Sequence, residues 1–227
     1  MKGVDMNVID AVKSRFSVRA YLDKPVEKET VYKVLDIARF APSGHNTQPW
    51  EVMVLMGKTK DRVSEKLIEA VKSGVERKYD FNYGSKETPD FIKARRRACN
   101  VKVFEHKGID PKVDKDKLQE HILENFRFFG APVDLLIMRD RRLGEEAFVD
   151  LGIFAQTVML VALEFGLGTC PQTSVVAYAD VLHKELNIPQ EKMIVMSIVL
   201  GYPDMDAHIN KLRMDRISVE EFATFTE

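Results

Sequence analysis

The sequence predicts a single domain of the α+β class. Segments with helical spacing of apolar residues alternate with short, continuous apolar runs that are typical of buried strands. No internal repeat, low-complexity tract or linker divides the 227 residues. A chain of this length can bury a sizeable core without disulfides. We therefore expect one domain over residues 1–227.

Composition excludes several broad classes of protein. Apolar residues make up 45% of the chain and charged residues 30%, which is typical of a globular domain. The formal net charge of −1 provides no overall field to attract nucleic acid or an anionic membrane. Two cysteines are too few for a disulfide scaffold and fit a reducing compartment. The first six residues lack an apolar signal core, so we expect a cytoplasmic location.

The first third of the chain predicts helices on either side of a strand. Helices are expected over residues 8–15 and 25–41, where apolar residues recur at helical spacing. An apolar strand is expected over residues 52–56. The Gly-Lys-Thr that begins at Gly57 lacks the upstream glycine of a phosphate loop, so we interpret it as a turn before a helix over residues 67–75.

Residues 77–118 have a weaker pattern. Aromatic residues are scattered among charges, and Arg95, Arg96 and Arg97 form a basic triplet. Long, weakly patterned insertions often serve as lids or binding loops. We interpret this segment as a helical lid over a substrate pocket. Binding of RNA by the triplet is the less favoured alternative, because the chain as a whole is nearly neutral.

The second half predicts two buried strands and a long apolar helix. Strands are expected over residues 133–138 and 193–200, and the apolar helix over residues 148–165. This helix is short for a membrane span and contains Glu164, so we interpret it as a core helix that Gly166 caps. The remaining expectations are a stiff polar loop at residues 170–174, a helix at 177–186 and a short last element within 217–225.

Three separated segments are rich in groups that bind anions and amides. Arg15, Ser17 and Arg19 alternate, so in an extended segment they face one way and suit an oxyanion such as phosphate. The second segment is the loop of residues 41–50, and the third covers residues 171–174, with a basic tail at the end of the chain. Each segment is also compatible with an ordinary solvated strand edge or turn. Together they suit a flat, phosphorylated, hydrogen-bonding cofactor.

Other chemistries find no support in the sequence. The five histidines fall in different segments without metal-ligand spacing, so no metal site is expected. The chain has no Gly-x-Ser-x-Gly elbow and no Gly-x-Gly-x-x-Gly dinucleotide turn. Cys170 is more consistent with packing at the end of a buried helix than with a nucleophile.

Four blocks of the sequence resemble the FMN-dependent nitroreductase family, a group of NAD(P)H-dependent flavin oxidoreductases. They are Ser-Arg-Phe-Ser-Val-Arg at 14–19, Ala-Pro-Ser-Gly-His-Asn-Thr-Gln-Pro-Trp at 41–50, Gly-Leu-Gly-Thr-Cys-Pro at 166–171 and Leu-Gly-Tyr-Pro at 200–203. Their order and spacing match the family, and only residues 77–118 are unmatched. The resemblance implies a nitroreductase-like fold with a central mixed, mainly antiparallel sheet flanked by helices. It also implies an intertwined homodimer with two FMN sites at the subunit interface.

The resemblance also implies which residues hold the cofactor. The implied cofactor-binding set is Arg15, Phe16, Ser17, Arg19, Pro42, Ser43, Asn46, Gln48, Arg127, Pro171, Gln172, Thr173, Arg213 and Arg216. Within this set Arg15, Ser17 and Arg216 would bind the phosphate and ribityl chain, with Arg213 as a second cation. The chain has Met214 where the family often has a basic residue.

The resemblance assigns catalytic roles to Arg19 and Thr173. Arg19 would lie at the N1 and O2 edge of the flavin, where a guanidinium stabilises the negative charge of the reduced ring. Arg127 is a second candidate for that edge. The backbone N–H of Thr173 would face N5, next to Pro171 and Gln172. The loop of residues 41–50 would reach the flavin bound mainly by the other subunit.

The implied activity is a ping-pong oxidoreduction. NADH or NADPH would transfer hydride to N5 of FMN, and a nitroaromatic, quinone or activated alkene would then take the electrons in the same pocket. Three alternatives remain open. They are another enzyme of the same fold (a reductive dehalogenase or an enzyme that fragments FMN), a flavin-binding protein without turnover, and a phosphate- or RNA-binding module.

Overall fold

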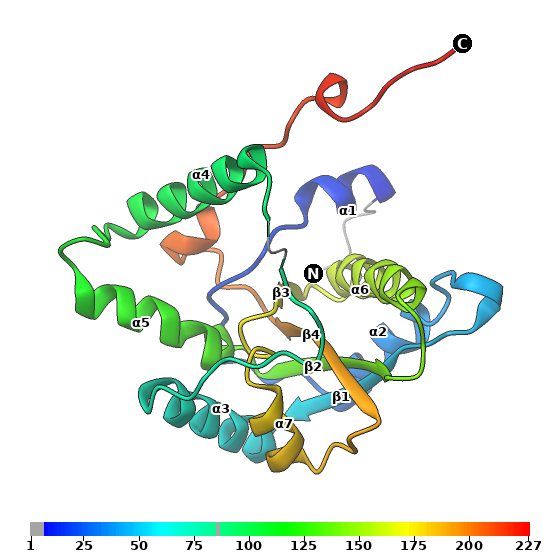
Figure 1. The fold of residues 1–227 in the computed structure, drawn as a ribbon, viewed down its shortest axis with the longest axis horizontal. Helices are drawn as coiled ribbons and strands as arrows, with labels where there is room; N and C mark the ends of the chain where they lie inside the picture. Colours follow the sequence, from blue (N-terminus) through cyan, green and yellow to red (C-terminus); the bar gives the residue numbers. More distant parts are fainter. Residues whose placement is uncertain (1–6, 85–86) are drawn as a thin grey trace.

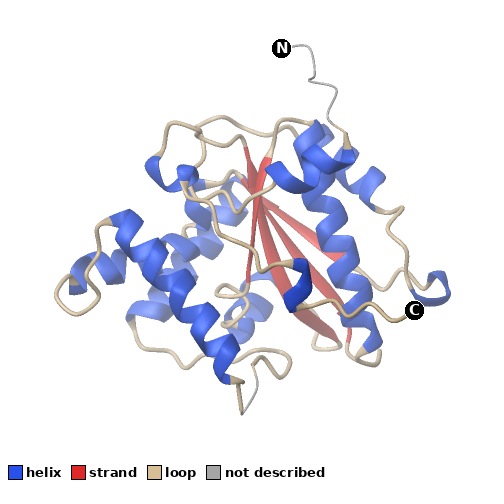
Figure 2. Cartoon of the chain, turned by 90° about the horizontal axis from the view of Figure 1, so that it is seen from above, coloured by secondary structure: helices blue, strands red, loops and turns tan. Residues whose placement is uncertain are grey.

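The computed structural model describes residues 7–84 and 87–227, which form a sheet of four strands with helices on both faces (Figures 1 and 2). The strands are β1 (Glu51–Met56), β2 (Val133–Asp140), β3 (Gly168–Gln172) and β4 (Lys192–Gly201), in the order β1-β2-β4-β3. All three neighbouring pairs are antiparallel. Among the described residues, parallel pairing occurs in two isolated bridges, Ser17–Thr169 and Lys78–Tyr178.

Two hydrophobic clusters pack the helices onto the two faces of the sheet. The helices are α1 (Val8–Ser14), α2 (Lys28–Ala38), α3 (Gly57–Lys72), α4 (Asp90–Lys107), α5 (Lys115–Phe126), α6 (Glu146–Glu164) and α7 (Ala179–Leu186). Successive side chains of β2 point to opposite faces. Leu135 packs with α2 and α6, whereas Leu136 packs with α3, α5 and α7. Both faces are therefore covered, which explains why β2 and β4 are continuous apolar runs.

Helix α6 is the apolar helix that the sequence predicts. By length and composition its 19 residues, with a mean hydropathy of 1.7, are sufficient to cross a membrane. Its apolar side chains instead pack against α2 and the sheet, as in a core helix. Gly166 follows it with φ of +67°, which confirms the predicted left-handed cap. Val149 and Ile153 on its outer side remain 65% and 38% exposed.

Two local predictions were wrong. Residues 57–60 do not form a turn, because α3 begins at Gly57 directly after β1. Gly57 has φ of +50°, and this left-handed conformation provides the change of direction without extra residues. Residues 170–172 are not part of a loop but belong to β3. A proline is tolerated there because β3 is the last strand of the sheet.

Residues 77–118 contain α4 and the start of α5. Helix α4 runs beside the C-terminal tail: the His106 ring stacks on His208 with centroids 3.9 Å apart, and Lys102 Nζ lies 2.7 Å from Asp215 Oδ2. The helix expected over residues 67–75 begins ten residues earlier, because it is the second half of α3, whereas the remaining predicted helices and strands lie within a few residues of their expected positions. The lid role of residues 77–118 stays a prediction.

A buried carboxyl group lies on the α3 side of the sheet. Asp134 is fully buried, and its Oδ1 accepts a hydrogen bond from Ser197 Oγ. Its Oδ2 has no partner among the described residues. Burial disfavours the charged form and raises the pKa of Asp134 to about 7, despite the opposing effect of the Ser197 hydrogen bond.

This carboxyl group predicts a pH dependence of stability. In the folded protein Asp134 titrates near pH 7, and in the unfolded chain near its ordinary value of 3.8. Its contribution to the free energy of unfolding is therefore largest below pH 4 and declines as pH rises through 7. At about 1.4 kcal/mol per pKa unit, the decline between pH 5 and 8 is about 3 kcal/mol at most.

Urea unfolding of the wild type and of Asp134→Asn at pH 5 and pH 8 measures this contribution. We expect the wild type to lose more stability than the variant over this range. An equal loss in the two proteins would show that Asp134 ionises normally in the fold.

Candidate functional site

A cavity of about 500 Å³ lies between the N-terminal segment, α4 and the C-terminal tail, and we call it the arginine pocket. It is lined by Val12, Lys13, Arg15, Phe16, Ser17, Arg19, Cys99, Leu212, Arg213, Met214 and Arg216. Two segments nearly 200 residues apart in the sequence supply its arginines. The structure thus brings together six of the predicted cofactor-binding residues: Arg15, Phe16, Ser17, Arg19, Arg213 and Arg216.

Backbone pairing with β3 and one buried asparagine hold the first segment in place. Ser17 forms a parallel bridge with Thr169, and Val18 N donates to Thr169 O at 3.0 Å. Asn210 Oδ1 accepts from Arg19 N at 2.8 Å, and its amide nitrogen donates to the carbonyls of Ala20 and Asp204, both at 2.7 Å. Asn210 therefore joins the N-terminal segment to the tail. Arg15, Ser17 and Arg19 all line the pocket, as their alternation in the sequence predicts, and Phe16 between them lines it as well.

The arginines of this pocket form no ion pairs within the described part of the chain. In the part of the chain that the structure describes, no carboxylate forms an ion pair with Arg15, Arg19, Arg213 or Arg216. Burial lowers the pKa of Arg15, and the nearby positive charge of Arg216 lowers it further. Guanidinium groups held close together without an acid form a site for an anion with several oxygens, such as phosphate.

Arg213 is engaged with the protein itself. Its Cζ lies 3.7 Å from the centroid of the Phe16 ring, and its Nη1 donates to the carbonyl of Asn210 at 2.6 Å. Arg213 and Phe16 thus form a stacked wall of the pocket. Arg216 Nη1 donates to the carbonyl of Met214 at 2.9 Å, which leaves most of its donors for a ligand.

The end of β3 carries a second set of polar groups. Gln172 is 7% exposed, and neither Nε2 nor Oε1 has a partner among the described residues. A buried amide without hydrogen bonds is costly, so a bound ligand with a donor and an acceptor would stabilise it. Thr173 Oγ1 and the Tyr83 hydroxyl are 2.9 Å apart. Pro171 lies on β3, two residues before Thr173.

The loop of residues 41–50 lies elsewhere in the same chain. It is next to α2 and α6 (Figure 1), where Gly44 N donates to Asp150 Oδ1 at 3.1 Å. Its predicted ligands Pro42, Ser43, Asn46 and Gln48 do not line the arginine pocket. Asn46 and Gln48 have positive φ, as does His45 between Gly44 and Asn46. Such strain in residues other than glycine is concentrated at functional sites.

Arg127 is also outside the arginine pocket. It follows the last turn of α5 and pairs with Glu120. Within one chain the structure therefore does not support the prediction that Arg127 serves the same edge as Arg19.

Sequence reasoning did not identify an aromatic group beside Thr173. Tyr79 and Tyr83 stack with centroids 4.5 Å apart, and the Phe81 ring lies edge-on to Tyr83 at 6.0 Å. The sequence feature that could have indicated this group is the alternation of aromatic residues at positions 79, 81 and 83. We call these three side chains the aromatic wall.

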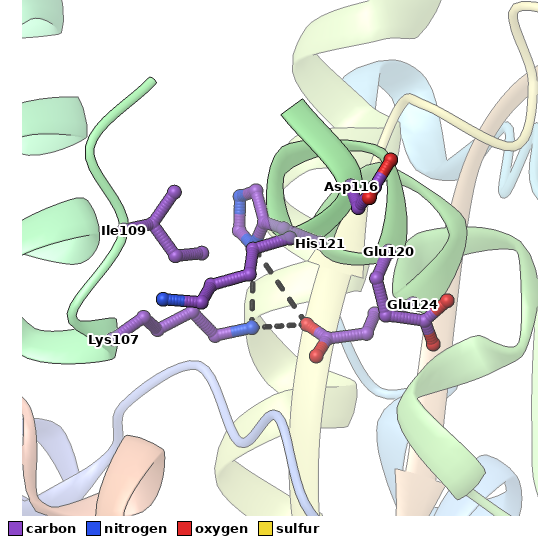
Figure 3. A pocket seen from close by; sticks show the side chains of 7 residues that line it. Lys107, Ile109, Asp116, Glu120, His121 and Glu124 are labelled. Atoms are coloured by element: carbon purple, nitrogen blue, oxygen red, sulfur yellow. Dashed lines mark hydrogen bonds and ion pairs between the residues drawn. The ribbon is translucent and has the colours of Figure 1, made fainter. Parts of the chain in front are cut away.

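A second cavity, of about 610 Å³, lies between α4 and α5 (Figure 3). Glu124 accepts from Lys107, whose Nζ lies 3.2 Å from His121 Nδ1. Because this lysine is already paired with a carboxylate and Asp116 and Glu120 add further acidic groups to the lining, this cavity is a weaker candidate for an anionic ligand. In the described residues no group of three His, Cys, Asp or Glu side chains lies close enough to hold a metal ion.

The fold and the arginine pocket define a protein with a candidate site for an anionic ligand beside the last strand of an antiparallel sheet. Comparison with known proteins identifies the family to which the protein belongs. The model of the nitroreductase family matches residues 12–202, and the chain belongs to this family. The family and fold predicted from the sequence are thereby confirmed, and so is the assignment to the oxidoreductases.

Relatives of similar length cover almost the whole chain. The chain is 35% identical over 217 residues to the chloronitrobenzene nitroreductase of Comamonas testosteroni, with 95% of each chain covered. It is 34% identical over 216 residues to nitroreductase NfnB of Mycolicibacterium smegmatis, with 95% of this chain and 91% of the relative covered. The FMN and NADPH-dependent nitroreductase NfnB of Sphigopyxis sp. strain HMH superimposes with a TM-score of 0.94 at 28% identity, covering 97% and 99% of the two chains.

The residues of this chain fit FMN. The guanidinium groups of Arg15 and Arg216, which form no ion pair among the described residues, can bind a phosphate. The side-chain amide of Gln172, which has no hydrogen-bond partner among the described residues, offers a donor and an acceptor to a flat ring. The cavity volume is within the range of ordinary cofactor sites.

Proposed function

We propose that this protein is an FMN-dependent oxidoreductase that uses NADPH or NADH to reduce nitroaromatic compounds. The observation that carries the proposal is the arginine pocket, in which Arg15 and Arg216 lie close together without an acid. Its relatives support the substrate class, since several are named for the reduction of nitroaromatic compounds. The NfnB of Mycobacterium smegmatis, crystallised with NADPH, superimposes with a TM-score of 0.90.

Each part of the site has a distinct task. Arg15, Ser17 and Arg216 bind the phosphate end of the cofactor, and Arg19 supplies a positive charge toward the ring. Gln172 and Thr173 provide hydrogen bonds at the end of β3. FMN, when bound, supplies the hydride-transfer chemistry, and the protein contributes position and electrostatics.

The aromatic wall favours a flat acceptor. Tyr83 is 51% exposed and contacts Thr173, so its ring is available to stack on an aromatic substrate beside the cofactor. A single pocket that receives the nicotinamide and then the acceptor gives ping-pong kinetics. Quinones and activated alkenes are also flat and are included in the proposal. Cys99 of α4 lines the arginine pocket, so α4 is the part of residues 77–118 that we propose as a lid.

We propose that the functional unit is an intertwined homodimer in the cytoplasm. Phe40, Phe222 and Phe225 are 76%, 68% and 82% exposed in the single chain, which indicates surfaces that a second copy covers. The C-terminal segment extends away from the body of the chain (Figure 1). The loop of residues 41–50, far from the arginine pocket of its own chain, would then contact the cofactor of the partner.

The role of Arg19 is tested by the reduction of bound flavin. Removing a cation that stabilises charge on the reduced ring slows reduction more than it weakens cofactor binding. We expect Arg19→Ala to retain FMN and to be reduced by NADPH at least tenfold more slowly than wild type, measured by anaerobic bleaching of the visible band. Arg39→Ala, which removes an exposed arginine paired with Asp36, serves as the control. Unchanged reduction of a fully loaded Arg19→Ala protein would refute this role.

Sharing of the site between two chains is tested with mixed dimers. Arg15→Gln and Asn46→Ala each impair both sites of their own homodimer. A heterodimer of the two variants has one site with both defects and one with neither. We expect co-expressed, differently tagged chains to recover one tight FMN site per dimer, measured by flavin content. No recovery, or tight FMN binding by a monomer, would contradict a shared site.

A further inference from the structure

The aromatic wall is attached to the domain through one buried carboxylate. The side chain of Asp80, which lies between Tyr79 and Phe81, is 7% exposed. Its Oδ2 accepts from His183 Nε2 and from the backbone N–H of Ile194, both at 2.8 Å, and its Oδ1 accepts from Arg141 Nη2. Asp80 thereby links its segment to α7, to β4 and to the turn after β2.

The groups around Asp80 are themselves fixed. His183 is 5% exposed, and its Nδ1 lies 2.9 Å from the carbonyl oxygen of Ile188. Both ring nitrogens of His183 therefore face an oxygen acceptor, the Ile188 carbonyl on one side and the Asp80 carboxylate on the other. Arg141 also donates to the carbonyls of Asp80 and Gln190, at 3.0 and 2.7 Å. The carboxylate therefore pairs with the Arg141 guanidinium and the His183 ring, and removal of its charge leaves the guanidinium without a counter-ion.

Tyr83, in contrast, has few restraints of its own. The described contacts of its side chain are the hydrogen bond with Thr173 and the ring contacts with Tyr79 and Phe81. Phe81 is fixed from its other side by Phe148 of α6, with ring centroids 5.3 Å apart. The orientation of Tyr83 therefore depends on the two rings that flank Asp80.

We propose that Asp80 is a positioning residue for the acceptor site. Its pairing with His183 and Arg141 holds Tyr79 and Phe81 as a cradle for the Tyr83 ring and so keeps this ring against Thr173. The inference rests on the proposed function. It adds that selectivity for flat aromatic acceptors depends on a buried ion cluster behind the aromatic wall.

The test compares two electron acceptors on FMN-loaded protein. Nitrobenzene is flat and can stack on Tyr83, whereas ferricyanide is an octahedral anion that needs no stacking surface. A misplaced positioning residue can cost up to about a hundredfold in rate. We expect Asp80→Asn to lower kcat/KM for nitrobenzene at least tenfold, mainly through KM. FMN content and NADPH–ferricyanide turnover should stay within twofold of wild type.

The matched control lies in the same segment. Lys78→Ala breaks the ion pair with Asp180, in which both side chains are about 70% exposed, and should leave both activities unchanged. A double-mutant comparison then asks whether Asp80 acts through Tyr83. In a Tyr83→Ala background, Asp80→Asn should change nitrobenzene kcat/KM less than twofold. A further tenfold loss in that background would overturn the proposal.

Other outcomes distinguish a positioning role of Asp80 from the proposed function of the protein. A parallel fall of both activities in Asp80→Asn would show a general structural role and refute positioning. If Asp80→Asn does not fold, Arg141→Gln should show the same selective loss, and an unchanged ratio of the two activities in that variant would also refute it. Wild-type protein that does not bind FMN or oxidise NADPH would refute the proposed function instead.

Discussion

The structure depends on one electrostatic constraint, the approach of two guanidinium groups without a neutralising acid. Arg15 follows α1 and Arg216 lies near the end of the chain; burial lowers the pKa of Arg15, and the positive charge of Arg216 lowers it further. The fold must therefore hold them against their mutual repulsion. It does so with rigid, uncharged contacts: the bridge of Ser17 to Thr169 and the three hydrogen bonds of Asn210. A bound phosphate would offset this repulsion. Repulsion between the two guanidinium groups in the free protein therefore favours binding of an anionic ligand.

The same edge of the sheet organises the rest of the site. Strand β3 pairs with β4 on one side and contacts the N-terminal segment on the other. Gly168 permits this approach, since a Cβ there would lie 2.5 Å from Val18 Cγ2. The strand ends at Gln172, and the next residue, Thr173, contacts Tyr83 of the aromatic wall. In the proposed function, the residues for the phosphate, the ring and the acceptor would thus lie at successive positions along β3 and its continuation.

The parts of this arrangement that could be predicted from sequence are those with local causes. Alternation in the first segment predicts that Arg15, Ser17 and Arg19 share one side, and continuous apolar runs predict the buried strands. The remaining features of the fold and of the site depend on tertiary contacts. Pairing with β4 makes Pro171 and Gln172 part of a strand, although the residue types favour a loop. Arg127, directly after α5, pairs with Glu120 of that helix, and the residue types alone do not reveal this pairing. The anchoring of the aromatic wall joins residues about 100 positions apart, which no local pattern reveals.

The central claim is that the arginine pocket recognises the phosphate of FMN, and a comparison of FMN with riboflavin tests it most directly. The two ligands share the same ring and ribityl chain and differ only in the phosphate group. Fluorescence titration of flavin-free protein should give an affinity for FMN at least a hundredfold higher than for riboflavin, because at least two charge-assisted contacts are lost, each of about 1.5–3 kcal/mol. In Arg15→Gln the difference between the ligands should shrink at least tenfold, with riboflavin binding unchanged. Equal affinities of the wild-type protein for the two ligands would contradict the account.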